Sequence, residues 1–192
     1  MAKKVITQKS RVSIVKKRWY SLQAPKVFND FIFGETLAGE PELLVGRSVR
    51  GNLSTILRGG KRQSMDGKFR IVEVKGNNCM TELVSLEILP SNVKRIVKRA
   101  KMRVDDSFVV ETKDDVKIRL KPMLLVKDDV QHGVLTALRV SCQNYFTRVA
   151  KENSFNEFTN KVVLGELYKD LKNELKKIYP VAVVEMRAFV KV

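Results

Sequence analysis

The chain has 192 residues, enough for one domain with a hydrophobic core of its own. A hydrophobic fraction of 44% and a charged fraction of 30% are typical of a folded protein rather than a disordered one. The 37 Lys and Arg residues outnumber the 21 Asp and Glu residues, and the net charge of +16 favours a polyanionic partner, either nucleic acid or an anionic membrane.

The sequence favours nucleic acid over a membrane as the partner, and it argues against export. The longest apolar runs, such as residues 123–126 and 181–184, are far shorter than a membrane-spanning helix. Lys and Arg interrupt the N-terminal segment, which therefore lacks the apolar centre of a signal peptide. The two cysteines, Cys79 and Cys142, are too few for a disulfide framework. We expect a cytoplasmic protein without a membrane partner.

The first segment of the chain is an extended basic arm. Residues 1–18 show neither periodicity nor a helix cap, and no acidic residue precedes Asp30. We predict an RNA-binding arm over 1–18, ordered by its partner, and a single domain over 19–192. A solubilising tail is the alternative interpretation of the same charges. The cations of the arm are Lys3, Lys4, Lys9, Arg11, Lys16, Lys17 and Arg18.

Three strands are predicted in the middle of the chain. Residues 47–57 and 68–75 are rich in β-forming residues and are bounded by Gly, Asn and Asp. The loop between them carries Lys61 and Arg62 near its tip. A Gly-Asn-Asn turn then precedes a long strand over 79–89. Alternation predicts that the core face of this strand carries Met80, Val84, Leu86 and Ile88.

A basic helix is predicted after Pro90. Ser91 is a candidate N-cap, and apolar residues follow it at helical spacing. No acidic residue lies between Glu87 and Asp105, so each pair of like charges four residues apart costs about 0.2–0.5 kcal/mol without compensation. Phosphate binding would make these charges favourable, and a solvated basic surface is the alternative. The predicted RNA-binding cations here are Lys94, Arg95, Lys98, Arg99, Lys101 and Arg103.

The second half of the chain predicts a hairpin followed by helices. Apolar and polar residues alternate over 104–110 and 116–126, which predicts a hairpin with one buried face. Pro122 indicates that the second of these strands lies at an edge or is interrupted. Asn153 and Ser154 are candidate helix caps. Three helices and a closing strand are predicted after the hairpin, over 134–149, 155–162, 164–178 and 181–192.

The sequence offers no clear catalytic constellation. His132 is the only histidine, which excludes a two-histidine metal site, and its place at a helix start favours a surface or capping role. Residues 46–54 have the glycine spacing of a P-loop, but Asn52 and Leu53 stand where Lys and Ser or Thr are required. We expect no enzyme activity, no cofactor and no metal. A Mg-dependent nuclease remains a third hypothesis because of three carboxylate pairs, at 105–106, 114–115 and 128–129.

The sequence also lacks the motifs of the common protein modules that recognise the base sequence of DNA or RNA. Zinc fingers need more Cys and His, no heptad repeat follows the basic helix, and "KFRIVEV" has only Phe69 of the aromatic residues that an RRM needs. The cations are instead spread over several segments. This pattern predicts recognition of the backbone and shape of a folded RNA rather than of its base sequence.

The segment "KKRWYSLQAPKVF" resembles the signature of the e-S-one family of small-subunit ribosomal proteins, also called the S-three-a-e family. It combines a basic run with Trp19, Tyr20, Pro25 and Phe28. The similarity continues through "GRSVRGNLSTI", "GNNCMTELVSLEI", the hairpin and the C-terminal helix and strand, in collinear order over nearly the whole chain. The absence of a longer basic C-terminal tail is typical of archaeal members.

The resemblance implies an α+β fold, with an antiparallel, barrel-like β core, accompanying helices and the extended basic arm. It also implies a structural, non-catalytic role on the platform of the small subunit, near the mRNA exit and the 3′ end of the rRNA. The implied partners are small-subunit rRNA and neighbouring platform proteins, with mRNA near the exit as a further candidate. The family's helix after the hairpin is rich in Lys and Arg, but here it has only Arg139, Arg148 and Lys151, so RNA contact is not carried over to it.

Trp19 is the remaining candidate RNA-binding residue. It could pack on the domain, which we favour beside Pro25, or stack on an exposed RNA base while the arm follows RNA grooves. The main alternative to a ribosomal role is a free-standing RNA-binding module with an extraribosomal function.

Overall fold

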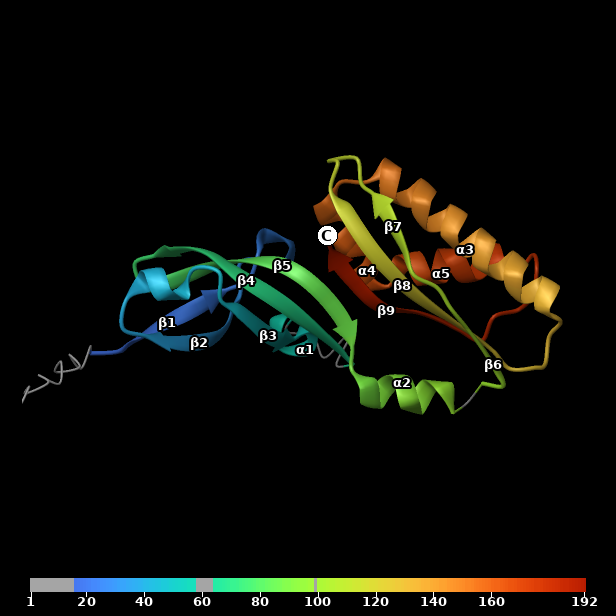
Figure 1. Ribbon diagram of the computed structural model, residues 1–192, viewed down its shortest axis with the longest axis horizontal. Helices are drawn as coiled ribbons and strands as arrows, with labels where there is room; N and C mark the ends of the chain where they lie inside the picture. Colours follow the sequence, from blue (N-terminus) through green and yellow to red (C-terminus); the bar gives the residue numbers. More distant parts are fainter. Residues whose placement is uncertain (1–15, 58–63, 99) are drawn as a thin grey trace, which may run out of the picture.

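The computed structural model describes residues 16–57, 64–98 and 100–192, which form nine strands, five α-helices and two short 3-10 helices. The molecule is elongated, with an N-terminal lobe made mostly of strands and a C-terminal lobe of strands and helices (Figure 1). All nine strands belong to one sheet, which does not close on itself within these residues. The α+β class is confirmed, with an open sheet as its β core.

The N-terminal lobe is built from five strands that follow one another along the chain. A short helix, α1 (Leu53–Ile56), and the 3-10 helices η1 (Lys26–Phe28) and η2 (Pro41–Leu44) connect them. The strands are β1 (Arg18–Gln23), β2 (Ile32–Ala38), β3 (Ser48–Asn52), β4 (Met65–Lys75) and β5 (Asn78–Ile88).

The C-terminal lobe contains the other four strands and four helices. The strands are β6 (Met102–Asp105), β7 (Phe108–Glu111), β8 (Lys117–Val126) and β9 (Val183–Lys191). The helices are α2 (Pro90–Val97), α3 (His132–Glu152), α4 (Phe155–Leu164) and α5 (Glu166–Leu175).

Strand β5 joins the two lobes. One of its edges pairs with β4 along nearly its whole length, in antiparallel orientation. Its other edge is shared, because Asn78, Cys79 and Met80 pair with β1 in parallel and residues 85–87 pair with β9 in antiparallel orientation. The strands of both lobes therefore lie in one sheet, and residues that pair directly across it point to the same face.

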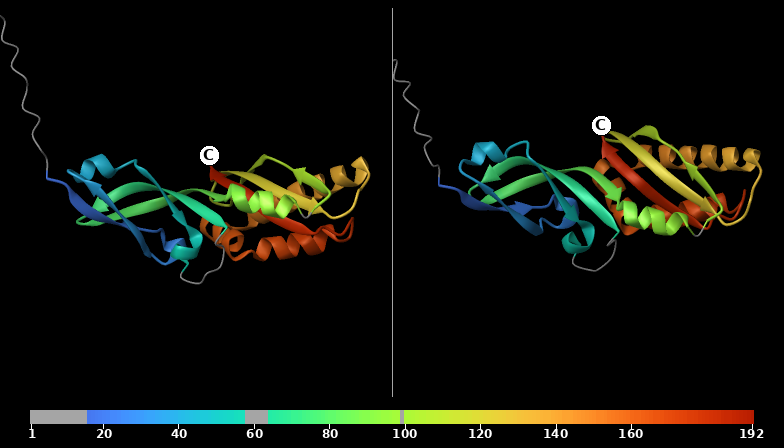
Figure 2. Two further views of the ribbon diagram at one scale, coloured as in Figure 1. Left: turned by 90° about the horizontal axis from the view of Figure 1, so that it is seen from below. Right: turned by 60° about the horizontal axis from the view of Figure 1, so that its bottom comes forward.

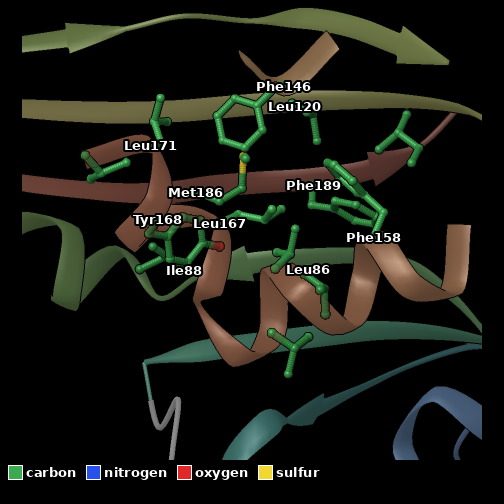
Figure 3. Packing of buried hydrophobic residues seen from close by; sticks show 14 of the residues in the cluster. Leu86, Ile88, Leu120, Phe146, Phe158, Leu167, Tyr168, Leu171, Met186 and Phe189 are labelled. Atoms are coloured by element: carbon green, nitrogen blue, oxygen red, sulfur yellow. The ribbon is translucent and has the colours of Figure 1, made fainter. Parts of the chain in front are cut away.

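The main core lies between the strands and a layer formed by α3, α4 and α5, which we call the helix layer. In Figure 3, Phe146 of α3 and Phe158 of α4 point toward the strands, where Met186 and Phe189 lie. The rings of Phe158 and Phe189 stack, with centroids 6.1 Å apart. Helix α2 is not part of this layer, since β8 and β9 run between it and α3 (Figure 2).

A smaller cluster anchors the start of the domain. Tyr20 and Leu22 of β1 are buried in it, with exposed fractions of 5% and 2%, and Phe28 is buried in the main core. Trp19 lies on the opposite side of β1 from Tyr20 and is 63% exposed. The prediction that Trp19 packs on the domain is therefore wrong, and Tyr20 and Phe28 fix the root of the arm instead.

Two strand predictions are partly wrong. A helix cap ends the first strand early, and a register shift changes which residues of the second are buried. The strand predicted over 47–57 ends at Asn52, whose side chain accepts a hydrogen bond from the Ser54 amide at 2.9 Å and caps α1. In β5 the register with β4 shifts at Val84, so Cys79 and Leu83, rather than Met80 and Val84, are buried on the side of Leu86 and Ile88.

Two further predictions were partly correct. Pro122 interrupts its strand, since the pairing of β8 with β9 shifts there, but β8 is an interior strand with neighbours on both sides. The basic helix exists, but it begins at Pro90, which occupies the first helical turn, so Ser91 is not its cap. Strands β1 and β2 were not predicted.

Candidate nucleic-acid interface

The predicted RNA-binding residues fall into two sets. One set lies outside the described residues, and nothing structural is inferred for it: Lys3, Lys4, Lys9, Arg11, Lys61, Arg62 and Arg99. The other set lies at the root of the arm and around α2: Lys16, Lys17, Arg18, Trp19, Lys94, Arg95, Lys98, Lys101 and Arg103.

Residues 16–19 form an exposed basic end of the N-terminal lobe. Lys16 and Lys17 are exposed and precede β1, whose first residue is Arg18. Trp19 pairs across the sheet with Leu37 of β2, which is also exposed. A flat aromatic side chain beside three cations is a surface on which an RNA base can stack, so the stacking interpretation stays a prediction.

Helix α2 packs on the main core through Val93, which is only partly buried. None of its side chains is fully buried, its N-cap residue Leu89 provides no side-chain hydrogen bond, and its first turn has no acidic residue. Lys94 and Lys98 are exposed and have no ion-pair partner within the described ranges. Arg95 donates a hydrogen bond of 2.6 Å to the Asn92 side chain of the same helix. Two of the cations therefore remain free to bind phosphate.

The two cations after α2 are partly neutralised by acids. Lys101 Nζ lies 3.6 Å from Asp129, and these side chains are 63% and 80% exposed. Arg103 binds Asp105 through Nε at 2.5 Å and Nη2 at 3.0 Å. The segment between Glu87 and Asp105 contains no acidic residue, but Asp105 and Asp129 lie close to two of its cations in the folded protein. The Lys101 contact is long and exposed, so it competes weakly with a phosphate group.

A groove brings cations from four elements together. Lys94 of α2 and Arg103 of β6 line it with Lys121 of β8 and Arg187 of β9, and its volume is about 450 Å³. Glu87 of β5 is the acidic residue in its lining. We call this hollow the α2 groove. Arg103 is already paired with Asp105, but Lys94, Lys121 and Arg187 still outnumber Glu87, and in a concave surface this excess creates a positive potential that attracts phosphate groups.

Lys121 and Arg187 were not among the predicted binding residues, and Arg187 reaches the groove through an irregularity in β9. Lys121 pairs with Ala188, but the next pair joins Pro122 to Met186, so Arg187 is an extra residue on β9. Met186 and Phe189 both lie in the main core. Arg187 and Ala188 lie between these two core residues in the sequence. Both therefore line the groove, on the face of the sheet opposite the main core.

The cations of α3 behave differently from those of α2. Arg139 donates a hydrogen bond to the Asp105 backbone oxygen at 3.3 Å. Arg148 binds Glu174 of α5 at 3.0 Å and lies over the Tyr145 ring, 5.7 Å from its centroid. Arg139 thus links α3 to β6, whereas Arg148 links α3 to α5 within the helix layer.

The described residues offer little for catalysis. They contain no group of three or more His, Cys, Asp or Glu side chains placed to hold a metal ion. Burial raises the pKa of Cys142 to about 12, so its thiol is protonated at neutral pH. Residues 48–52, inside the P-loop-like sequence, form strand β3 rather than a phosphate-binding loop. No helix in the described part of the chain is long and apolar enough to cross a membrane.

Comparison with known proteins assigns the family. Residues 6–192 match the model of the Ribosomal S3Ae family. The chain belongs to this family. It is 33% identical to the small ribosomal subunit protein eS1 of Nanoarchaeum equitans over 91% of this chain and 88% of that protein. It is 30% identical to the eS1 protein of Methanobrevibacter smithii, over 97% and 96% of the two chains.

A third Ribosomal S3Ae relative is similar over almost as much of its length. The eS1 protein of Methanothermobacter thermautotrophicus is 27% identical over 88% of this chain and 87% of its own. The resemblance to archaeal members of the family, first seen around Trp19 and Tyr20, is thereby confirmed. The individual RNA-binding residues stay predictions.

Proposed function

We propose that the chain is a structural protein of the small ribosomal subunit and binds small-subunit rRNA. It is a member of a ribosomal protein family, and its similar proteins are named for the small subunit. Its place of action is the ribosome, in the cytoplasm. Its role is to hold rRNA in a folded arrangement, without catalysis.

The α2 groove is the observation that carries the RNA-binding part of the proposal. Lys94, Lys121 and Arg187 line it, and none of them has an ion-pair partner among the residues that the structure describes. Like charges exposed along a helix without compensation cost about 0.2–0.5 kcal/mol per pair, and a bound anion removes this cost. The ribose-phosphate backbone supplies closely spaced anions and releases counterions when it is bound.

The arm and the place in the subunit complete the proposal. Residues 1–18 follow rRNA grooves, and Trp19, exposed at their root, stacks on an unpaired base. We place the protein on the platform, near the mRNA exit and the 3′ end of the rRNA, beside other platform proteins and within reach of mRNA. The supports for this placement are the family and the basic segment "KKRWYSLQAPKVF".

Charge reversal on α2 tests RNA binding. The triple variant Lys94→Glu, Lys98→Glu and Lys101→Glu is expected to weaken binding of a small-subunit rRNA fragment. The plot of log affinity against log salt should become less steep by roughly 2 to 3, because each phosphate contact contributes about 0.7–0.9. The matched control reverses Lys169, Lys176 and Lys177 in and after α5, which are also exposed. An unchanged slope in the α2 variant would exclude this helix from the interface.

Sedimentation tests the ribosomal assignment. The full chain should co-sediment with small subunits in high salt, whereas a free-standing RNA-binding module would dissociate. Mg-dependent cleavage of the rRNA fragment that is lost in an Asp105→Asn variant would instead favour the nuclease hypothesis.

A further inference from the structure

A second, smaller hollow lies on the sheet beside the α2 groove. Arg50 of β3 and Lys68 of β4 line it, with Ser85 and Glu87 of β5, and its volume is about 130 Å³. Arg50 pairs directly with Lys68, and Lys68 pairs directly with Ser85. These side chains therefore point to the same face of the sheet.

This hollow is continuous with the α2 groove. Both are lined by Glu87, Ile88 and Pro90, at the end of β5 and the start of α2. The pairing explains the continuity, because Glu87 pairs with Ala188 of β9 and Ala188 pairs with Lys121 of β8. We call the two hollows together the outer trough. Its cations come from six different elements: Arg50, Lys68, Lys94, Arg103, Lys121 and Arg187.

An acidic pair divides the outer trough. Asp66 of β4 pairs directly with Glu87 of β5, and two like charges opposite each other destabilise a sheet. Asp66 accepts a hydrogen bond of 3.0 Å from the Asn52 side chain, while Glu87 has no ion-pair partner among the described residues. The cations thus form two groups, with Arg50 and Lys68 on one side of the acids and the α2 groove on the other.

We propose that the outer trough holds a single strand of RNA, whose phosphates occupy the two cationic ends. The inference rests on the proposed function and extends it to Arg50, Lys68, Lys121 and Arg187. The smaller hollow has room for about four water molecules, at about 30 Å³ each, so it admits one phosphate or one sugar.

The acidic pair fixes which part of the strand lies at the centre. A phosphate beside Asp66 and Glu87 would be repelled, so the strand turns a sugar or a base toward them. Carboxylates accept hydrogen bonds from ribose 2′-hydroxyl and base amino groups, and the amide oxygen left by Glu87→Gln can accept the same bonds without the negative charge. Removal of one of these charges makes the centre of the trough less repulsive to the backbone.

Fluorescence anisotropy with a labelled single-stranded RNA and a hairpin duplex of equal length tests the proposal. The double variant Arg50→Gln and Lys68→Gln should bind the single strand at least fivefold more weakly. Its salt slope should fall by about 1.4, because each single-strand phosphate contact contributes about 0.7. The matched control, Lys169→Gln in α5 and Lys176→Gln just after it, should change neither the affinity nor the salt slope. Glu87→Gln removes one negative charge and leaves every cation in place, so this variant should bind the single strand two- to fivefold more tightly.

The outcomes separate this inference from the proposed function. If Arg50→Gln with Lys68→Gln behaves like the control while the α2 triple variant loses affinity, the trough proposal is overturned and the proposed function stands. If neither loses affinity, RNA binding by this face is wrong altogether. An equal loss for the duplex, or unchanged or weaker binding by Glu87→Gln, also overturns the single-strand assignment.

Discussion

Helix α2 and the helix layer lie on different sides of the same strands, and they are stabilised in different ways. Helix α3 alone buries six side chains, among them Leu138, Cys142 and Phe146. Helix α4 begins with a capping box, in which Ser154 and Glu157 exchange hydrogen bonds. Helix α2 has no fully buried side chain and no side-chain cap. The helix layer is thus part of the core, whereas α2 is attached to its surface.

The cations of the two regions show the same difference. Arg139 and Arg148 of α3 bind groups of the protein itself. Lys94 and Lys98 of α2 are exposed and bind none in the described ranges. A high net charge alone does not tell these roles apart. The partners of each side chain do: Arg139 and Arg148 contribute to stability, whereas Lys94 and Lys98 stay predicted RNA-binding residues.

The largest expected difference between the helix layer and α2 is the loss of stability when a large apolar side chain is truncated to Ala. Phe146 of α3 is fully buried and packs on Tyr145 and Phe108, with ring centroids 5.5 Å and 6.3 Å away. Phe146→Ala should lower the free energy of unfolding by about 3–5 kcal/mol. Ile96→Ala in α2, a partly exposed position, should lower it by about 1 kcal/mol or less. Urea unfolding followed by circular dichroism measures both, and similar losses would show that α2 is as much a part of the core as α3.

A smaller effect compares single cations of the two regions. Arg148→Gln should lower the free energy of unfolding by about 0.2–1 kcal/mol, since its ion pair with Glu174 is partly exposed, and should leave the salt slope of RNA binding unchanged. Lys98→Gln should do the reverse, with a slope lower by about 0.7–0.9 and a stability raised by about 0.2–0.5 kcal/mol at most, since it relieves the repulsion between Lys94 and Lys98. Thermal unfolding and anisotropy titrations at several salt concentrations measure the two variants. A change in slope with Arg148→Gln would contradict the division of roles.

Long periodic segments were predictable from the sequence. Helices α3, α4 and α5 and strands β8 and β9 follow their apolar spacing, and Ser154 was identified as a candidate cap. The unpredicted strands β1 and β2 are different. Residues 18–23 alternate only over the short stretch 20–23, and the strand forms because it pairs with β2 and, in parallel, with the distant β5. Such pairing depends on tertiary structure that local pattern does not contain.

The candidate site was predictable only in part for the same reason. Lys94 and Lys98 could be identified because they lie in a short stretch without acids. Lys121 belongs to the polar face of an alternating strand, but the sequence does not show that this face meets α2. Arg187 reaches the groove only because the register of β9 shifts beside it. Asp129, which lies near Lys101, is far from it in sequence.

The smallest expected effect on stability comes from the charge of Glu157 in the capping box of α4. Helix α2 has no such capping box. The Ser154 backbone amide donates a hydrogen bond of 3.1 Å to the Glu157 carboxylate and holds the pKa of this carboxyl below its usual value. A lowered folded-state pKa stabilises the protein above the unfolded pKa of about 4.3, and this stabilisation is lost as the pH falls through the folded value.

Glu157→Gln keeps an amide oxygen that can accept the same hydrogen bond but removes the charge. The variant should be slightly less stable than the wild type at pH 7, and the difference should shrink below about pH 4.3 as the wild-type carboxyl becomes protonated. Urea midpoints of both proteins at pH 7, 5 and 3 measure this difference, and the other carboxylates cancel because both proteins contain them. A difference that stays constant down to pH 3 would mean that the charge of Glu157 does not stabilise the helix layer.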